Sequence, residues 1–105
     1  MVLERAQFRI TPGREDEFER AFEQAKLVIA GSRGFLGATL SRGVESPSTY
    51  LLLVEWATLE DHTVGFRESP AFGEWRGLIG HLFDGAPDVE HFVQVAAVTQ
   101  PATAG

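Results

Sequence analysis

Apolar residues recur along the chain first at every second position and then at every third or fourth, and each change of period marks a predicted element. The first segment places Ala6, Phe8 and Ile10 on one face and polar residues on the other, which predicts a strand. Thr11 and Pro12 then predict a helix start, with Thr11 as N-cap and Pro12 at the first helical position. The stripe that this helix would bury consists of Phe18, Ala21, Phe22, Ala25 and Ile29.

The next segments predict two strands and a second helical stretch. Residues 35–43 favour a strand, and residues 50–56 favour another that is apolar on both faces, as expected of a central strand. Thr58 and Asp61 loosely match a capping box, which predicts a helical segment that contains His62. The chain thus has three candidate strands before its last third.

The last third predicts one more helix and one more strand. Ser69 is a cap residue followed by proline, so a helix begins there. Its apolar stripe consists of Phe72, Trp75, Ile79 and Leu82. Residues 85–87 break this pattern, and residues 89–97 alternate as a fourth strand. Residues 99–105 show no apolar period, so we expect one domain over 1–98 and a flexible tail.

The predicted order βαββαβ places this protein in the α+β class. Two right-handed split βαβ units give the ferredoxin-like topology, an antiparallel sheet with both helices on one face and the first and third strands in the centre. Two helices cover only one face of such a sheet. Because the third strand is apolar on both faces, the uncovered face predicts a homodimer.

Composition restricts the partners and the chemistry. The 15 acidic residues outnumber the 9 basic ones, for a net charge of -6, which argues against nucleic acid or an anionic membrane as partner. There is no cysteine, so thiolate nucleophiles, thiolate metal sites and disulfides are excluded. The N-terminus is charged where a signal peptide would be apolar, and no apolar run approaches the ~20 residues that span a bilayer. We expect a soluble cytoplasmic protein.

Local motifs add little. The chain has no glycine-rich phosphate loop, HExxH, GxSxG or calcium loop. His62, His81 and His91 are not spaced to place two imidazoles on one helix face, so we expect no metal. Residue types alone indicate a soluble domain of unknown role.

Four segments resemble the antibiotic biosynthesis monooxygenase family. They are EWATLEDHTVGFRESPAFGEW at 55–75, RGFLG at 33–37, TPGR at 11–14 and VEHF at 89–92. The match runs from residue 2 to about residue 96 in the expected order. The resemblance implies a ferredoxin-like homodimer whose sheets form a β-barrel, with a small-molecule cavity between helices and sheet in each protomer.

The resemblance also implies an oxygen chemistry without cofactors. In quinone-forming members, an electron-rich phenol or anthrone is deprotonated and then oxidised by O₂ without flavin or metal. Trp56 matches a tryptophan of those members and Arg76 a pocket arginine, while His62 stands in place of a tyrosine. The implied catalytic residues are therefore His62 as base or proton relay, Arg76 and Trp56. The implied substrate-binding residues are Phe66, Phe72 and Trp75.

Other interpretations stay open. Haem-degrading members carry Asn, Trp and His where this chain has Ala6, Phe66 and Arg76, so haem oxygenation is the weakest reading. A dimeric barrel that binds a small apolar ligand without catalysis is the main alternative. Each candidate also has an ordinary structural role, with Trp56 as core and His91 as a hydrogen-bonded strand histidine.

Overall fold

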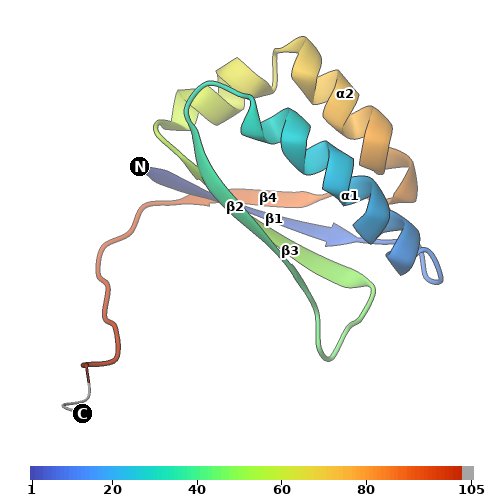
Figure 1. Cartoon of the computed structure of the whole chain (residues 1–105), viewed down its shortest axis with the longest axis horizontal. Coiled ribbons are helices and arrows are strands. Elements are labelled where there is room, and N and C mark those ends of the chain that lie inside the picture. Colours follow the sequence, from blue (N-terminus) through green and yellow to red (C-terminus); the bar gives the residue numbers. More distant parts are fainter. Residues whose placement is uncertain (103–105) are drawn as a thin grey trace.

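The fold is a single sheet covered on one side by helices (Figure 1). The structure, a computed structural model, describes residues 1–102. Its elements in chain order are β1 (Val2–Arg9), α1 (Glu15–Ala30), β2 (Phe35–Arg42), β3 (Thr49–Trp56), η1 (Asp61–Phe66), α2 (Pro70–Ile79), η2 (Gly80–Leu82) and β4 (Asp88–Phe92). The segment η1 is a π-helix and η2 a 3₁₀-helix.

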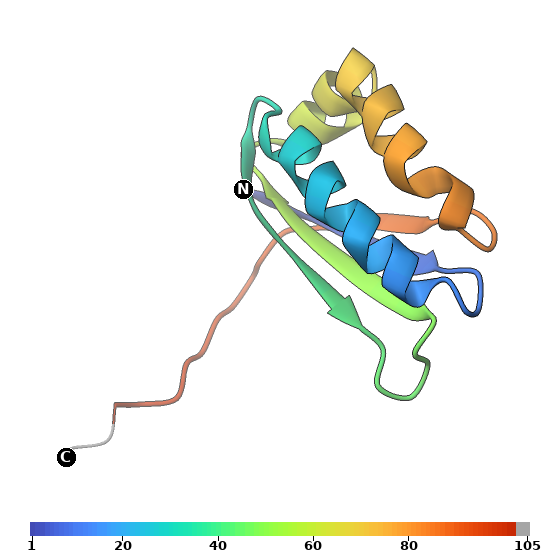
Figure 2. The same ribbon diagram turned by 45° about the vertical axis from the view of Figure 1, so that its right-hand side comes forward.

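The sheet has the strand order β2-β3-β1-β4, and every neighbouring pair is antiparallel. Strands β1 and β3 are therefore central, and α1 and α2 lie side by side on one face, as the turned view makes clear (Figure 2). The predicted ferredoxin-like βαββαβ topology is confirmed.

The core lies between the helices and the inward face of the sheet. Along β3, Tyr50, Leu52, Val54 and Trp56 are buried while the residues between them are more exposed. The predicted stripe of α1 meets them, with Phe18, Phe22, Ala25 and Ile29 buried. The two periods in the sequence thus converge on one core.

The predicted start of the first helix was wrong. Thr11 and Pro12 lie in a turn, and the Thr11 hydroxyl donates to the carbonyl of Leu82 instead of capping the helix. Gly13 adopts a left-handed φ of 91°, which a helix cannot contain, so α1 begins only at Glu15.

The capping box before η1 is confirmed. The backbone N–H of Asp61 donates to Thr58 Oγ1 at 3.1 Å, and the N–H of Thr58 donates to Asp61 Oδ2 at 3.2 Å. This reciprocal pair fixes where the chain enters η1, which carries His62 inward.

The fourth strand is shorter than predicted. Its pairing with β1 ends at Leu3 opposite Phe92, one residue from the start of β1, so the chain beyond has no partner strand. Val93 and Val95 are consequently exposed and outside the sheet. Residues 99–102 of the predicted tail have no regular structure, and 103–105 lie outside the described residues. The division at residue 98 stays a prediction.

The opposite face of the sheet is half apolar. Leu51 and Leu53 point away from the helices and are half-buried, and Arg5 beside them pairs with Asp88 at 3.2 Å and with Glu90. Among residues 1–102, no helix has the length and apolar character needed to cross a membrane.

Candidate active site

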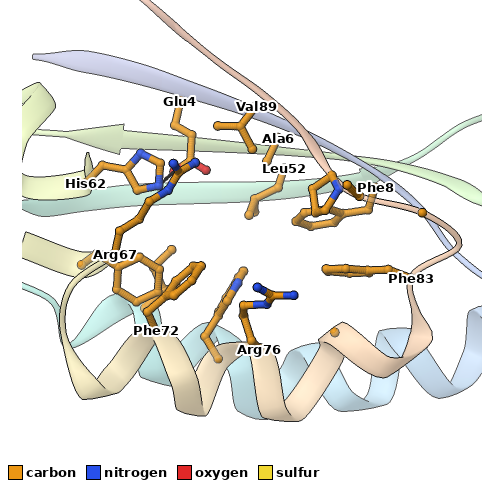
Figure 3. A pocket seen from close by; sticks show the side chains of 17 residues that line it. Glu4, Ala6, Phe8, Leu52, His62, Arg67, Phe72, Arg76, Phe83 and Val89 are labelled. Carbon is orange, nitrogen blue, oxygen red and sulfur yellow. Dashed lines mark ion pairs between the residues drawn. The ribbon is translucent and has the colours of Figure 1, made fainter. Parts of the chain in front are cut away.

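A cavity of about 610 Å³ opens between the sheet and the helices (Figure 3). The sheet contributes Glu4, Ala6, Phe8, Leu52 and Val89. The helical side contributes Ile29, His62, Phe66, Arg67, Phe72, Trp75 and Arg76. The remaining wall comes from Phe83 and the loop before β4. Its volume and its apolar walls with a few polar groups are typical of sites for small molecules.

Five of the six residues singled out in the sequence line this cavity. They are His62, Phe66, Phe72, Trp75 and Arg76. Trp56 is not part of the lining. It is fully buried behind His62, with the two rings stacked and their centroids 5.3 Å apart. Its place in the site is therefore behind the wall, where it supports His62.

Aromatic rings form the helical wall. Phe66 meets Phe72 edge to face at 5.4 Å between centroids and Trp75 at 6.1 Å. Such T-shaped contacts hold the rings in fixed orientations. The exposed Arg76 extends over the Phe72 ring, with its guanidinium carbon 6.0 Å from the centroid, and points into the cavity in Figure 3. A flat, electron-rich ligand bound here would contact aromatic rings and the positive charge of Arg76.

A series of polar contacts links the sheet to η1, and two of its members, Glu4 and His62, line the cavity. Trp56 Nε1 donates to Glu4 Oε1 at 2.9 Å, and His62 Nε2 lies 3.3 Å from the same oxygen. His62 Nδ1 is 2.7 Å from His91 Nε2. Glu4 and His62 are 5% and 3% exposed. The four side chains come from β1, β3, η1 and β4, so only the fold assembles them.

Burial shifts the pKa values of these polar side chains. It raises the pKa of Glu4, although the Trp56 hydrogen bond and the charge of Arg67 pull it back. The pKa of His62 is lowered to about 4. Burial is the largest cause, followed by the positive charge of Arg67 and by His91. Burial and Arg67 also lower the pKa of His91. Both imidazoles are therefore neutral at pH 7.

Sequence reasoning missed Glu4 and Arg67 and gave His91 only a structural role. The signal for Glu4 was present, because it shares the face of Ala6 and Phe8 on a strand whose inward positions are otherwise apolar. His91 likewise shares the face of Val89. Nothing in the linear spacing indicated that Glu4, His62 and His91 would meet.

Metal binding finds no support in the geometry. Within residues 1–102, no group of three or more His, Asp or Glu side chains could hold a metal ion. The expectation of a protein without metal or cofactor stays a prediction.

Comparisons with known proteins identify the family of this chain. The family model described as antibiotic biosynthesis monooxygenase matches residues 1–78. The uncharacterised protein YczJ of Bacillus subtilis (strain 168) is 48% identical over 95 residues, which cover 90% of this chain and 100% of YczJ.

Solved structures point the same way. A Bordetella bronchiseptica protein assigned to the antibiotic biosynthesis monooxygenases is 40% identical, with a TM-score of 0.88 over 90% of this chain and 97% of that one. SnoaB, a cofactor-independent oxygenase from Streptomyces nogalater, is 20% identical, with a TM-score of 0.77 over 94% and 97% of the two chains. At that identity it supports the fold alone. On the family match and the two closer relatives, this chain belongs to the antibiotic biosynthesis monooxygenase family.

Proposed function

We propose that this protein is a cofactor-independent monooxygenase that oxidises a small electron-rich aromatic of the quinol or anthrone type with O₂. The observation that carries the proposal is a cavity with aromatic walls, a buried acid and imidazole near Arg67, and a second arginine, Arg76, on α2. Such a cavity suits a flat ring system that must lose a proton and be held as an anion.

The reaction begins with loss of a substrate proton. The proton goes to the side of the cavity that holds Glu4 and His62, and the substrate keeps the electron pair. The anion then donates electrons to O₂, one oxygen atom enters the product, and the other leaves as water. The substrate supplies all the electrons, so the chemistry requires no flavin.

Each candidate residue has a role in this scheme. Arg76 supplies a permanent positive charge that favours the substrate anion over the neutral form. Phe66, Phe72 and Trp75 hold the ring and exclude water, which strengthens these charge interactions. Trp56 keeps Glu4 and His62 in place from behind.

We also propose that the protein works as a homodimer. The outward face of the sheet presents half-buried leucines, Leu51 and Leu53, and the exposed Phe92 at its edge. A second copy packed on this face would remove that apolar surface from water.

Haem degradation is not proposed. The positions where haem-degrading relatives carry Asn, Trp and His are Ala6, Phe66 and Arg76, and all three line this cavity. None of these side chains is an iron ligand.

The test is oxygen consumption with a panel of reduced quinols and anthrones, run beside melting shifts with the same compounds. We expect uptake of O₂ and a raised melting temperature for at least one compound, and loss of both in Arg76→Ala. Arg33→Ala, which removes an exposed arginine outside the cavity lining, serves as the matched control. Melting shifts without O₂ uptake would contradict the oxygenase and support the alternative of a non-catalytic ligand-binding barrel.

A further inference from the structure

The cavity contains a carboxylate in a place where a carboxylate is costly. Glu4 lies on the central strand β1, is 5% exposed, and has apolar neighbours along its inward face. Burying a charged carboxylate destabilises a protein unless it is paired and hydrogen-bonded. Its persistence on the cavity wall calls for a role in what the cavity binds.

The contacts of Glu4 involve only one of its two carboxylate oxygens. Oε1 accepts the hydrogen bond from Trp56 Nε1 and faces His62 Nε2 at 3.3 Å. Both contacts involve Oε1, so Oε2 is the oxygen available to a molecule in the cavity that Glu4 lines (Figure 3).

The same contacts decide which nitrogen of His62 carries its proton. An ionised Glu4 favours an N–H at His62 Nε2, because a nitrogen lone pair would face a negative oxygen. His62 is neutral, so its Nδ1 then holds a lone pair and accepts from His91 Nε2–H at 2.7 Å. In this arrangement both nitrogens of His62 are occupied, and His62 has no free lone pair for a substrate proton.

We propose that Glu4, rather than His62, is the catalytic base of this cavity, and that Glu4 Oε2 takes the proton of a phenolic hydroxyl. His62, His91 and Trp56 are positioning residues that act through Glu4. The inference rests on the proposed function, because it names the group that starts that reaction.

The step balances within the cavity. The substrate O–H bond breaks, a new O–H bond forms at Oε2, and the electron pair stays on the substrate oxygen. One negative charge thereby moves from Glu4 to the substrate oxygen. Arg67, which acts on Glu4, and Arg76 on α2 both line the cavity and can stabilise that charge. Burial supports the step, since a carboxylate with a raised pKa is a stronger base.

The pH dependence follows from the groups that face Glu4. His62 and Arg67 approach it from η1 and the residue after it, and His91 is its cross-strand partner on β4. Strand β3 contributes the uncharged Trp56, α1 lines the cavity with Ile29, and α2 contributes Arg76. Both imidazoles have lowered pKa values and Glu4 a raised one, so the loss of activity in acid should include the protonation of Glu4.

The first experiment uses 4-nitrophenol, whose phenolate absorbs visible light, and needs no turnover. The wild type should bind it as phenolate at a pH where the free probe is largely protonated. That binding should release no net proton in weakly buffered solution, because Glu4 keeps the proton. Glu4→Gln, which keeps the shape and an acceptor for Trp56, should release about one proton for each phenolate bound. Glu55→Gln removes an exposed carboxylate on β3 and should change nothing.

Two outcomes would overturn the inference. One is a wild type that binds only the neutral phenol. The other is a Glu4→Gln variant that binds phenolate without releasing a proton, which would return the role of base to His62. Glu4→Gln should fold at least as well as the wild type, because it removes a buried charge.

A second variant tests the inference independently, in case Glu4→Gln does not fold. Trp56→Phe keeps the aromatic ring but removes the N–H that lowers the pKa of Glu4. The pH below which phenolate binding releases a proton should therefore move higher. A purely structural Trp56 would weaken binding equally at every pH, and that result would contradict the inference.

Oxygen uptake separates this inference from the proposed function. Glu4-dependent ionisation of 4-nitrophenol without O₂ uptake from any quinol or anthrone would refute the oxygenase and leave Glu4 as a proton acceptor. O₂ uptake that survives Glu4→Gln would keep the oxygenase and refute Glu4 as its base. If both proposals hold, Glu4→Gln should lower turnover by ~10²-fold or more.

Discussion

The rings of Trp56 and His62 lie stacked, with centroids 5.3 Å apart and planes inclined by 19°. Trp56 ends strand β3 and His62 is in η1, so the contact spans the turn between them. It holds the imidazole plane in the direction that presents Nε2 to Glu4 and Nδ1 to His91. Trp56 thereby contacts His62 and Glu4 without lining the cavity.

The buried His62 predicts a stability that falls in mild acid. Its pKa of about 4 when folded lies below the 6.5 of an ordinary histidine, so the unfolded chain binds more protons between these values. From pH 7 to pH 5 this group alone should lower the free energy of unfolding by about 2 kcal/mol. Glu4 acts in the opposite sense, because its raised pKa favours the folded state as pH falls.

Denaturant titrations at pH 7 and pH 5 test this dependence. His62→Gln cannot titrate and should lose most of the difference between the two pH values. His81→Gln removes an exposed histidine and should keep it. An unchanged pH dependence in His62→Gln would mean that other groups cause the acid sensitivity.

Gly34 occupies a backbone position that should not tolerate any side chain. Its φ of 82° is strained for other residues, and a Cβ there would overlap the carboxyl of Asp61 that closes the capping box. Gly34→Ala should lower the free energy of unfolding by ~2 kcal/mol or more. Gly73→Ala has open space on α2 and should instead stabilise by up to ~1 kcal/mol, measured by the same unfolding curves. Equal effects of the two variants would contradict this reading.

Arg76 predicts a preference for anionic ligands. Arg76→Ala should weaken the binding of 4-nitrophenolate by about 1.5 kcal/mol, roughly tenfold. This is the low end of a charged hydrogen bond, because Arg76 is exposed and screened by solvent. Calorimetry with the neutral isostere 4-nitroanisole should register almost no change. Equal losses for both ligands would indicate that Arg76 only packs against Phe72.

A leucine-to-lysine substitution should have a different effect on each face of β3. Leu53→Lys places a charge on the outward face and should release folded monomers, seen by light scattering as a fall toward the chain mass of 11.5 kDa. Leu52→Lys places the charge in the cavity wall, where Leu52 is 1% exposed, and should unfold the protein. Leu27→Lys on the exposed side of α1 serves as the control. A wild type that scatters as a monomer at micromolar concentration would refute the dimer.

The sequence by itself determined the elements, their order and the face that each one buries. Periods of two and of three to four decide strand or helix locally, and the order βαββαβ then leaves few ways to form one sheet. The sequence-based prediction was wrong where a local pattern allowed two interpretations. Pro12 looked like a helix start, but the left-handed Gly13 delays α1 to Glu15. The alternation to residue 97 looked like strand, but β1 offers no partner beyond Leu3.

Only the tertiary structure decided the chemistry of the site. Glu4, His62 and His91 are separated by 58 and 29 residues in the chain, so no spacing rule links them, and the pairing of β1 with β4 and the inward turn of η1 bring them together. Their altered pKa values come from burial, which depends on everything packed around them. The same packing placed Trp56 behind the cavity wall, because the inward end of β3 is already covered by η1.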